Sequence, residues 1–268
     1  MMKRNGILFT GKKILLSFAF LSTMSMLQLN AGEQFAMSDA DRAMYKEMLE
    51  NNPAEIYVEE GGEIFEEALG GEEALAKFLE VSEKDLPKYI AGFPRYIKKL
   101  GNVVGIDQVL QAMQVSQGKE KTKLKSGKMF SMLAYVKSLA NDELINIDVE
   151  ADEHIKASYE LGKITYMTAR GGRGLSCNSC HSADIVGQVL RTQPLPDLGE
   201  VAVAGTWPAY RMTKSSLRTP QRRFQGCMNN ALLKVIPIGS KEMVALEVYI
   251  ATLAKEKNKK IAIPGLKR

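Results

Sequence analysis

The run Cys177-Asn178-Ser179-Cys180-His181 has the residue types and the spacing that covalent haem attachment needs. Two cysteines three positions apart can each form a thioether with one haem vinyl group, and the adjacent histidine can place an imidazole nitrogen on the iron. Such a run can also be a redox-active dithiol, a structural disulfide, or part of a zinc site that draws in Cys227 and His154. The histidine directly after the second cysteine favours haem. The sequence therefore predicts one covalently bound haem c with that histidine as an axial ligand of the iron.

Cys227 is the third and last cysteine, and it lies at the end of a basic segment. From Trp207 to Cys227 the chain has no acidic residue and five basic ones: Arg211, Lys214, Arg218, Arg222 and Arg223. Such a run is most often a solvated face, but cations beside a thiol also favour the thiolate and attract small anions. A thiolate can bind ferric iron or react with sulfur. Together with a haem, this thiol indicates redox chemistry on an anionic sulfur compound.

The second axial ligand of the iron stays open between several residues that follow His181. Electron-carrying cytochromes place a methionine there, and the candidates are Met212, Met228 and Met243. Met243 fits the apolar stripe of a helix, and His154 falls among acidic residues at a helix start, so both are weaker candidates. The spacing does not choose between Cys227 and the remaining methionines. A mono-haem electron-transfer cytochrome c with a methionine ligand is therefore the alternative function.

The two halves of the chain repeat each other, and helical periodicity dominates both. The tetrapeptide 93–96 corresponds to 207–210, and a closing helix over 129–140 corresponds to one over 243–254, at a spacing near 114 residues. An opening helix is predicted over 152–168, where Gly162 and Tyr166 repeat the pair Gly61 and Phe65; a glycine there lets another helix cross closely. Counted from Gly61, the window 76–80 stands where the haem-binding run would be, and Ala112 stands opposite Cys227.

This repeat predicts a mostly α protein of two tandem cytochrome c-like domains, of which only the second carries haem. We expect a haem-free domain over 32–146, a linker near 141–149, and a haem domain over 147–268. Residues 1–31 have the basic start, the apolar stretch and the small residues of a signal peptide, so we expect a periplasmic protein without a membrane anchor after its removal. Without these residues, 32 basic side chains face 31 acidic ones, so the composition does not favour nucleic-acid binding.

Three stretches of the second half resemble the SoxA family, the subunits of the SoxAX thiosulfate-oxidising cytochromes. They are 191–196 (RTQPLP), 207–211 (WPAYR) and 221–228 (QRRFQGCM), the last being the most specific. Many members of that family carry two haems in tandem cytochrome c domains, whereas this chain has no cysteine in its first half. The chain therefore resembles a single-haem form.

The resemblance implies a reaction and the residues that perform it. The cysteine of the QRRFQGC run is the distal iron ligand in that family and occurs as a persulfide, which corresponds to Cys227. The arginine four residues earlier contacts the substrate, which corresponds to Arg223. The family joins thiosulfate oxidatively to a cysteine of the carrier SoxYZ, passes electrons to a cytochrome, and works as a heterodimer with the haem protein SoxX. The resemblance therefore implies an L-cysteine S-thiosulfotransferase.

Overall fold

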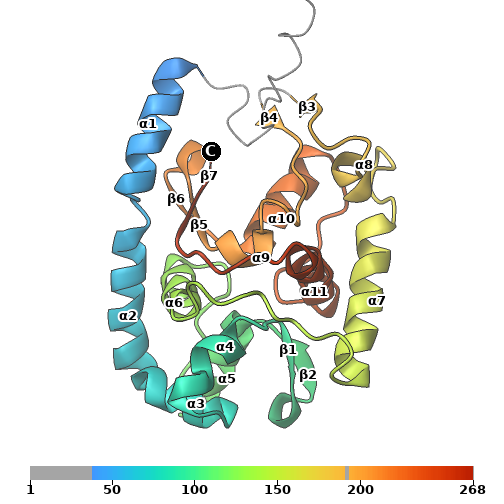
Figure 1. Cartoon of the computed structure of the whole chain (residues 1–268). Helices are drawn as coiled ribbons and strands as arrows, with labels where there is room; N and C mark the ends of the chain where they lie inside the picture. The colour runs from blue at the N-terminus through green and yellow to red at the C-terminus, as the bar shows by residue number, and fades with distance from the viewer. Residues whose placement is uncertain (1–37, 191–192, 268) are drawn as a thin grey trace, which may run out of the picture.

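The computed structural model describes residues 38–190 and 193–267, and the predicted signal segment 1–31 lies outside them. This part of the chain is mostly helical, as predicted, with short strands of two or three residues (Figure 1). The sequence did not predict these strands, because runs of that length are too short to show an alternating pattern. Among the described residues, no helix is long and apolar enough to cross a membrane.

The first half contains the following elements: α1 (Asp39–Glu50), α2 (Glu55–Leu69), α3 (Gly71–Leu79), α4 (Leu86–Ile90), β1 (Arg95–Ile97), β2 (Asn102–Val104), α5 (Ile106–Ser116) and α6 (Gly127–Ser138). Strands β1 and β2 form an antiparallel hairpin. The closing helix α6 starts at its N-cap Ser126, whose side chain accepts a hydrogen bond from the Met129 amide. It confirms the helix predicted near 129–140, two residues earlier at each end.

The second half contains α7 (Glu153–Met167), α8 (Asn178–His181), β3 (Val189–Leu190), β4 (Gln193–Pro194), α9 (Val203–Thr206), β5 (Ala209–Arg211), β6 (Ser216–Arg218), α10 (Pro220–Asn230), α11 (Lys241–Glu256) and β7 (Gly265–Lys267). Strand β5 pairs antiparallel with β6 and parallel with β7. The opening helix α7 and the closing helix α11 confirm the helices predicted over 152–168 and 243–254.

Each half is built on a pair of helices that cross at a glycine. A Cβ atom on Gly61 would overlap the Ser131 carbonyl of α6, and one on Gly162 would overlap the Ala245 carbonyl of α11. Both glycines therefore allow the close crossing that their spacing predicted. Beside the second crossing, the Tyr166 ring lies 5.0 Å from that of Tyr249. In Figure 1, α6 and α11 lie in the middle of the molecule, between α2 and α7.

The repeat is regular from the hairpins onward. The N-caps Gly105 and Thr219 begin α5 and α10, and the N-caps Ser126 and Ser240 begin α6 and α11; each pair stands 114 residues apart. This constant offset places Met113, not Ala112, opposite Cys227, which corrects the sequence comparison by one residue. The crossing glycines stand only 101 residues apart, because the second half has extra chain around the β3–β4 hairpin.

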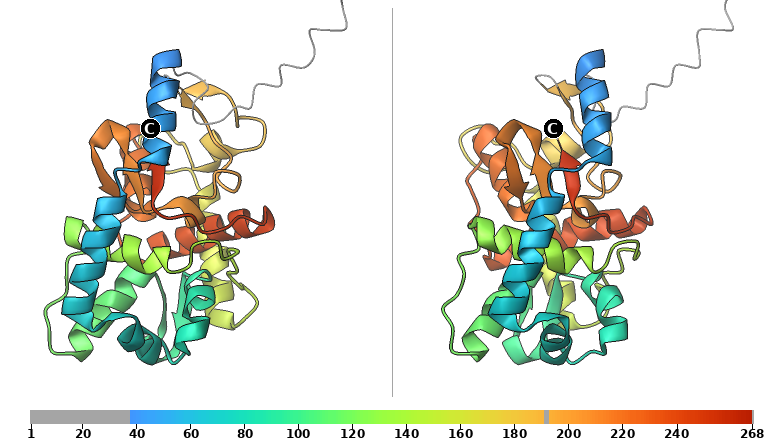
Figure 2. Two further views of the ribbon diagram at one scale, coloured as in Figure 1. Left: turned by 60° about the vertical axis from the view of Figure 1, so that its left-hand side comes forward. Right: turned by 90° about the vertical axis from the view of Figure 1, so that its left-hand side faces the viewer.

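The hydrophobic core is continuous across the two halves. Its largest cluster joins residues of α2, α3, α5 and α6 to Val248, Ala251 and Ala254 of α11. A second cluster lies in the second half around Trp207 and Phe224. Helix α1 reaches up to the second half beside the C-terminal strand (Figure 2), where the Tyr45 hydroxyl donates to the Leu266 carbonyl at 3.0 Å.

Candidate haem site and the cysteine beside it

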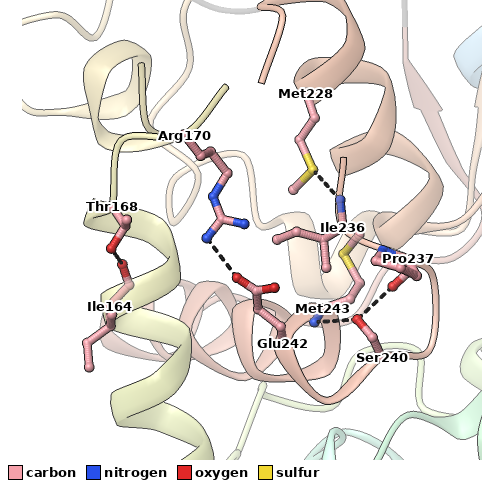
Figure 3. A network of polar contacts seen from close by, with 9 residues as sticks. All are labelled: Ile164, Thr168, Arg170, Met228, Ile236, Pro237, Ser240, Glu242 and Met243. Atoms are coloured by element: carbon pink, nitrogen blue, oxygen red, sulfur yellow. Dashed lines mark hydrogen bonds and ion pairs between the residues drawn. The ribbon is translucent and has the colours of Figure 1, made fainter. Parts of the chain in front are cut away.

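The haem-binding run lies on a loop and a short helix that follow α7. Gly171 has φ +77°, and a Cβ there would come within 2.7 Å of Leu233 Cα, so this loop needs a glycine. Arg170, just before it, pairs with Glu242 at the start of α11, with 2.7 Å between Nη2 and Oε1 (Figure 3). The carbonyl of Cys177 then accepts from the amides of Cys180 and His181, both at 3.1 Å. This turn brings both thiols and the imidazole to one end of α7.

The imidazole of His181 is held in a fixed orientation. Its Nδ1 lies 2.8 Å from the Pro196 carbonyl, and a carbonyl can only accept, so Nδ1 carries the proton and Nε2 keeps the free electron pair that binds a metal. Burial lowers the pKa of His181, which favours the neutral form that ligates iron; the charge of Arg223 lowers it further. The Tyr166 hydroxyl also donates to the His181 carbonyl at 3.3 Å.

Helix α10 presents two chemically different faces. Gln221, Phe224, Gln225 and Met228 are buried, at the i, i+3, i+4, i+7 spacing of one helical stripe. Arg223 and Cys227, four residues apart, lie on the opposite, partly exposed face. A Cβ on their neighbour Gly226 would meet no atom within 4 Å. The sequence thus folds so that the thiol and the guanidinium share the open side of α10.

The open side of α10 faces the haem-binding run. Burial, and to a lesser extent the nearby Cys227, raises the pKa of the Cys177 thiol to about 11. Burial and Cys227 raise the pKa of Cys180 as well. Because Arg223 also acts on His181, the structure brings together all five residues that the sequence singled out for the site.

The three methionines and the second histidine have other positions. Met228 is buried, and its Sδ accepts from the Ile236 amide at 3.4 Å (Figure 3). Met243 is fully buried on α11, and Met212 packs in the cluster of Tyr45 and Leu266. None of these thioethers shares the open face of α10 with Cys227.

His154 belongs to the other end of α7. Its ring stacks on that of Tyr96, with the ring centroids 4.0 Å apart. The thirteen residue steps from His154 to Met167 span about 20 Å of helix, so the imidazole cannot reach Cys177 or Cys227. Within the described residues, no group of three or more His, Cys, Asp or Glu side chains could hold a metal ion. The zinc alternative is therefore not supported.

The residues of this site fit a covalently attached haem. Two thiols would form the thioethers, His181 offers Nε2 to the iron, and Cys177 itself packs against an apolar wall that includes Trp207 and Phe224. The open space beside Gly226 leaves room on the Cys227 side. A bound haem c would therefore lie between α8 and the open face of α10.

The corresponding region of the first half does not fit a covalent haem. Helix α3 stands where the haem-binding run would be, and its Leu75, Ala76 and Leu79 are buried in the core. The Phe78 ring is covered by the Lys99 ammonium, 4.4 Å from the ring centroid. No cysteine or histidine occurs anywhere in residues 38–153. The first half therefore offers neither thioether attachment nor an imidazole ligand.

Four hydrogen bonds of the site were not predicted from the sequence. Two hold the haem-binding run: His181 Nδ1 with the Pro196 carbonyl, and the Tyr166 hydroxyl with the His181 carbonyl. The other two hold the buried face of α10, through the side chains of Gln221 and Gln225. The type of a residue does not show where its backbone carbonyl will point, so the Pro196 carbonyl could not be predicted as an acceptor. The buried stripe of α10 could have been found from the spacing of Gln221, Gln225 and Met228.

Comparison with known proteins gives consistent results. Residues 60–145 match the family described as SoxA/TsdA, cytochrome c domain. The L-cysteine S-thiosulfotransferase subunit SoxA of Hydrogenophilus thermoluteolus is 29% identical, over 96% of this chain and 100% of its own length. The SoxA subunit of Hydrogenobacter thermophilus is 28% identical, over 81% of this chain and 82% of its own. The crystal structure of SoxXA from P. pantotrophus shares the fold, with a TM-score of 0.66 at 23% identity over 81% of this chain and 79% of that one.

The helical frame and the Cys-x-x-Cys-His run are those expected of a c-type cytochrome, and residues 60–145 are similar to a cytochrome c domain. The matched residues 60–145 fall in the half that has no haem-binding run. Over most of its length, the chain is similar to the SoxA subunits of L-cysteine S-thiosulfotransferase.

Proposed function

We propose that this chain is the subunit of a thiosulfate-oxidising L-cysteine S-thiosulfotransferase that joins thiosulfate to a cysteine of the carrier protein SoxYZ. The observation that carries the proposal is the shared open face of α10, where Cys227 and Arg223 lie beside the haem-binding run. The names of the relatives support the reaction class. One haem c, attached at Cys177 and Cys180, would have His181 and Cys227 as axial ligands of its iron.

The side chains of the site account for substrate binding and sulfur transfer. The Arg223 guanidinium can pair with the sulfonate oxygens of thiosulfate, a dianion, and so direct its terminal sulfur toward Cys227. A sulfur–sulfur bond then forms between Cys227 and that terminal sulfur, with the loss of one proton and two electrons to a cytochrome acceptor. The haem supplies a one-electron redox centre when bound. The thiolate of the carrier finally attacks the transferred sulfur and releases the Cys227 thiolate.

The wider organisation is part of the same proposal. The chain would consist of a haem-free cytochrome c-like domain over 32–146 and a haem domain over 147–268. It would form a heterodimer with the cytochrome SoxX, as the fold shared with the SoxXA crystal structure supports. Removal of residues 1–31 would leave the chain in the periplasm, where it would meet SoxYZ and thiosulfate.

The test is thiosulfate-dependent cytochrome reduction by the holoprotein with SoxX and SoxYZ present. We expect Cys227→Ala to abolish the reduction and Arg223→Ala to lower kcat/KM by at least about a hundredfold, as expected when one charged partner of an anion is removed. Lys214→Ala is the matched control, because Lys214 lies in the same basic segment but is exposed. Normal turnover by Cys227→Ala contradicts the proposal.

The alternative is an electron-transfer cytochrome with a methionine ligand. The buried position of Met228 and the cluster around Met212 both disfavour it. A thioether-bound haem and a thiolate-bound haem have different ferric absorption spectra, so the spectrum of the holoprotein decides between the two functions.

A further inference from the structure

Both the buried face of α10 and the haem-free half form hydrogen bonds with one residue, Gly239. Gln221 of α10 accepts from the Gly239 amide at 2.8 Å. Gln108 of α5, in the first half, donates to the Gly239 carbonyl at 3.0 Å. The backbone of Gly239 therefore connects α5 of one half to α10 of the other.

Gly239 itself has little freedom to move. Its φ is +74°, and a Cβ there would overlap Cδ1 of Leu124, which also belongs to the first half. In the same loop, the Ile236 carbonyl accepts a hydrogen bond from the side-chain amide of Gln225 at 2.9 Å. The Ile236 backbone amide donates to the Sδ of Met228. The loop 236–239 is thus held by three residues of the buried stripe of α10 on one side and by the first half on the other.

A second set of contacts reinforces the link. The side-chain nitrogen of Gln221, Nε2, donates to Glu247 Oε2 of α11 at 2.8 Å. Glu247 lines a cavity of about 20 Å³ together with Lys137 and Asp107 of the first half, large enough for one water molecule. The Lys137 ammonium in turn donates to the Trp207 carbonyl at 2.8 Å, just before β5. The first half therefore lines a cavity together with the partner of Gln221 and contacts the segment that leads into β5.

These contacts fix the rotation of α10 about its axis. Gln221, Gln225 and Met228 lie on one side of the helix, and Arg223 and Cys227 lie on the other. A helix whose buried side is anchored at three levels cannot turn its open side without breaking those bonds. The direction of the Cys227 thiol therefore depends on hydrogen bonds that begin in the haem-free half.

We propose that Gln108 is a positioning residue for the active-site cysteine, acting through the backbone of Gly239 and through Gln221, and that this is one role of the haem-free half. The inference rests on the proposed function for the Cys227 ligand of the haem iron and for its turnover readout. Its direct readout is the ligand field of the ferric haem, because a shifted Cys227 changes the second axial ligand.

The test compares Gln108→Leu and Gln221→Leu with Gln111→Leu in the full-length holoprotein. Gln111 lies one turn further along α5, and its amide donates to the Thr122 carbonyl at 2.7 Å, within the first half. The control therefore loses a comparable hydrogen bond on the same helix without touching the loop 236–239. The measurements are the ferric absorption and electron paramagnetic resonance spectra, the melting temperature, and kcat and KM.

We expect Gln108→Leu and Gln221→Leu to shift the ligand-sensitive ferric bands in the same direction and to lower kcat about tenfold, with KM little changed. Gln111→Leu keeps the wild-type spectrum. An unchanged spectrum in Gln108→Leu overturns the inference, even if the melting temperature falls. So does the same spectral shift in Gln111→Leu, because the effect would then be general destabilisation. If the wild-type protein has no thiosulfate activity, the proposed function fails, and the spectra still test the positioning role.

Discussion

Replacing Gly162 with alanine tests the helix crossing that supports the haem half. The added Cβ would lie 2.6 Å from the carbonyl carbon of Ala245 and 2.9 Å from Tyr249 Cβ, whereas carbon atoms in contact prefer about 3.5–4.0 Å. The nearest atoms belong to the backbone of α11 and cannot rotate away, so α7 and α11 must separate by about 1 Å. Overpacking of this kind costs about 1–3 kcal/mol, and we take the upper value because the obstacle is rigid.

The net loss of stability is smaller than the cost of overpacking alone. Alanine is about 1 kcal/mol better than glycine inside a helix, so the free energy of unfolding should fall by about 2 kcal/mol. For a chain of this size that corresponds to a melting temperature lower by about 4–8 °C. Tyr166, one turn beyond Gly162, contacts both Tyr249 and the His181 carbonyl, so the separation should also reach the haem-binding run.

The assay is thermal and urea unfolding of the purified holoprotein. Gly127→Ala is the control, because Gly127 is the first residue of α6 and a Cβ there meets no atom within 4 Å. The control should be unchanged or more stable by up to about 1 kcal/mol. A Gly162→Ala protein within about 0.5 kcal/mol of wild type would refute the reasoning, because it would show that the two helices are not in close contact at this glycine.

Two further predictions concern buried groups outside the reaction. Met228→Leu should leave the ferric haem spectrum unchanged and lower stability by about 1–3 kcal/mol, because the Ile236 amide loses its acceptor; a changed spectrum would mean that Met228 reaches the iron. Burial raises the pKa of Asp107 to about 7 in the folded protein, from an ordinary value of 3.8, so the folded state binds more protons between these values and stability falls as the pH rises from about 4 to 7. Asp107→Asn should flatten that slope in urea unfolding at pH 5 and pH 7, and an equal slope in both proteins would contradict the assignment.

The repeated features of the chain were predictable because they occur twice. The pairs Gly61–Phe65 and Gly162–Tyr166 predicted close helix crossings, and the structure confirms both. The closing helices were visible from apolar stripes. The alignment near Cys227 was wrong by one residue, because side-chain similarity in a single helix fixes the register less well than the N-caps Gly105 and Thr219 do.

The sequence predicted which residues could form the site but not how they are held. Cys177, Cys180 and His181 are recognisable by residue type and spacing, and Cys227 was conspicuous as the odd cysteine. The choice between Cys227 and Met228 stayed open because neighbours in a helix point about 100° apart, and only packing shows which one faces the core. The backbone acceptor of His181 and the hydrogen bond from Gln108 to Gly239 depend on long-range folding.

The central claim is that Cys227 is the sulfur-carrying residue of a protein with one attached haem. The most direct measurement is the intact mass of periplasmically produced protein, denatured, before and after incubation with thiosulfate and an electron acceptor. We predict that the denatured wild-type chain keeps the mass of one haem and gains the mass of added sulfur after the incubation. The Cys227→Ser chain should not gain that mass. A chain without covalent haem, or a Cys227→Ser protein that carries the same added sulfur, would contradict it.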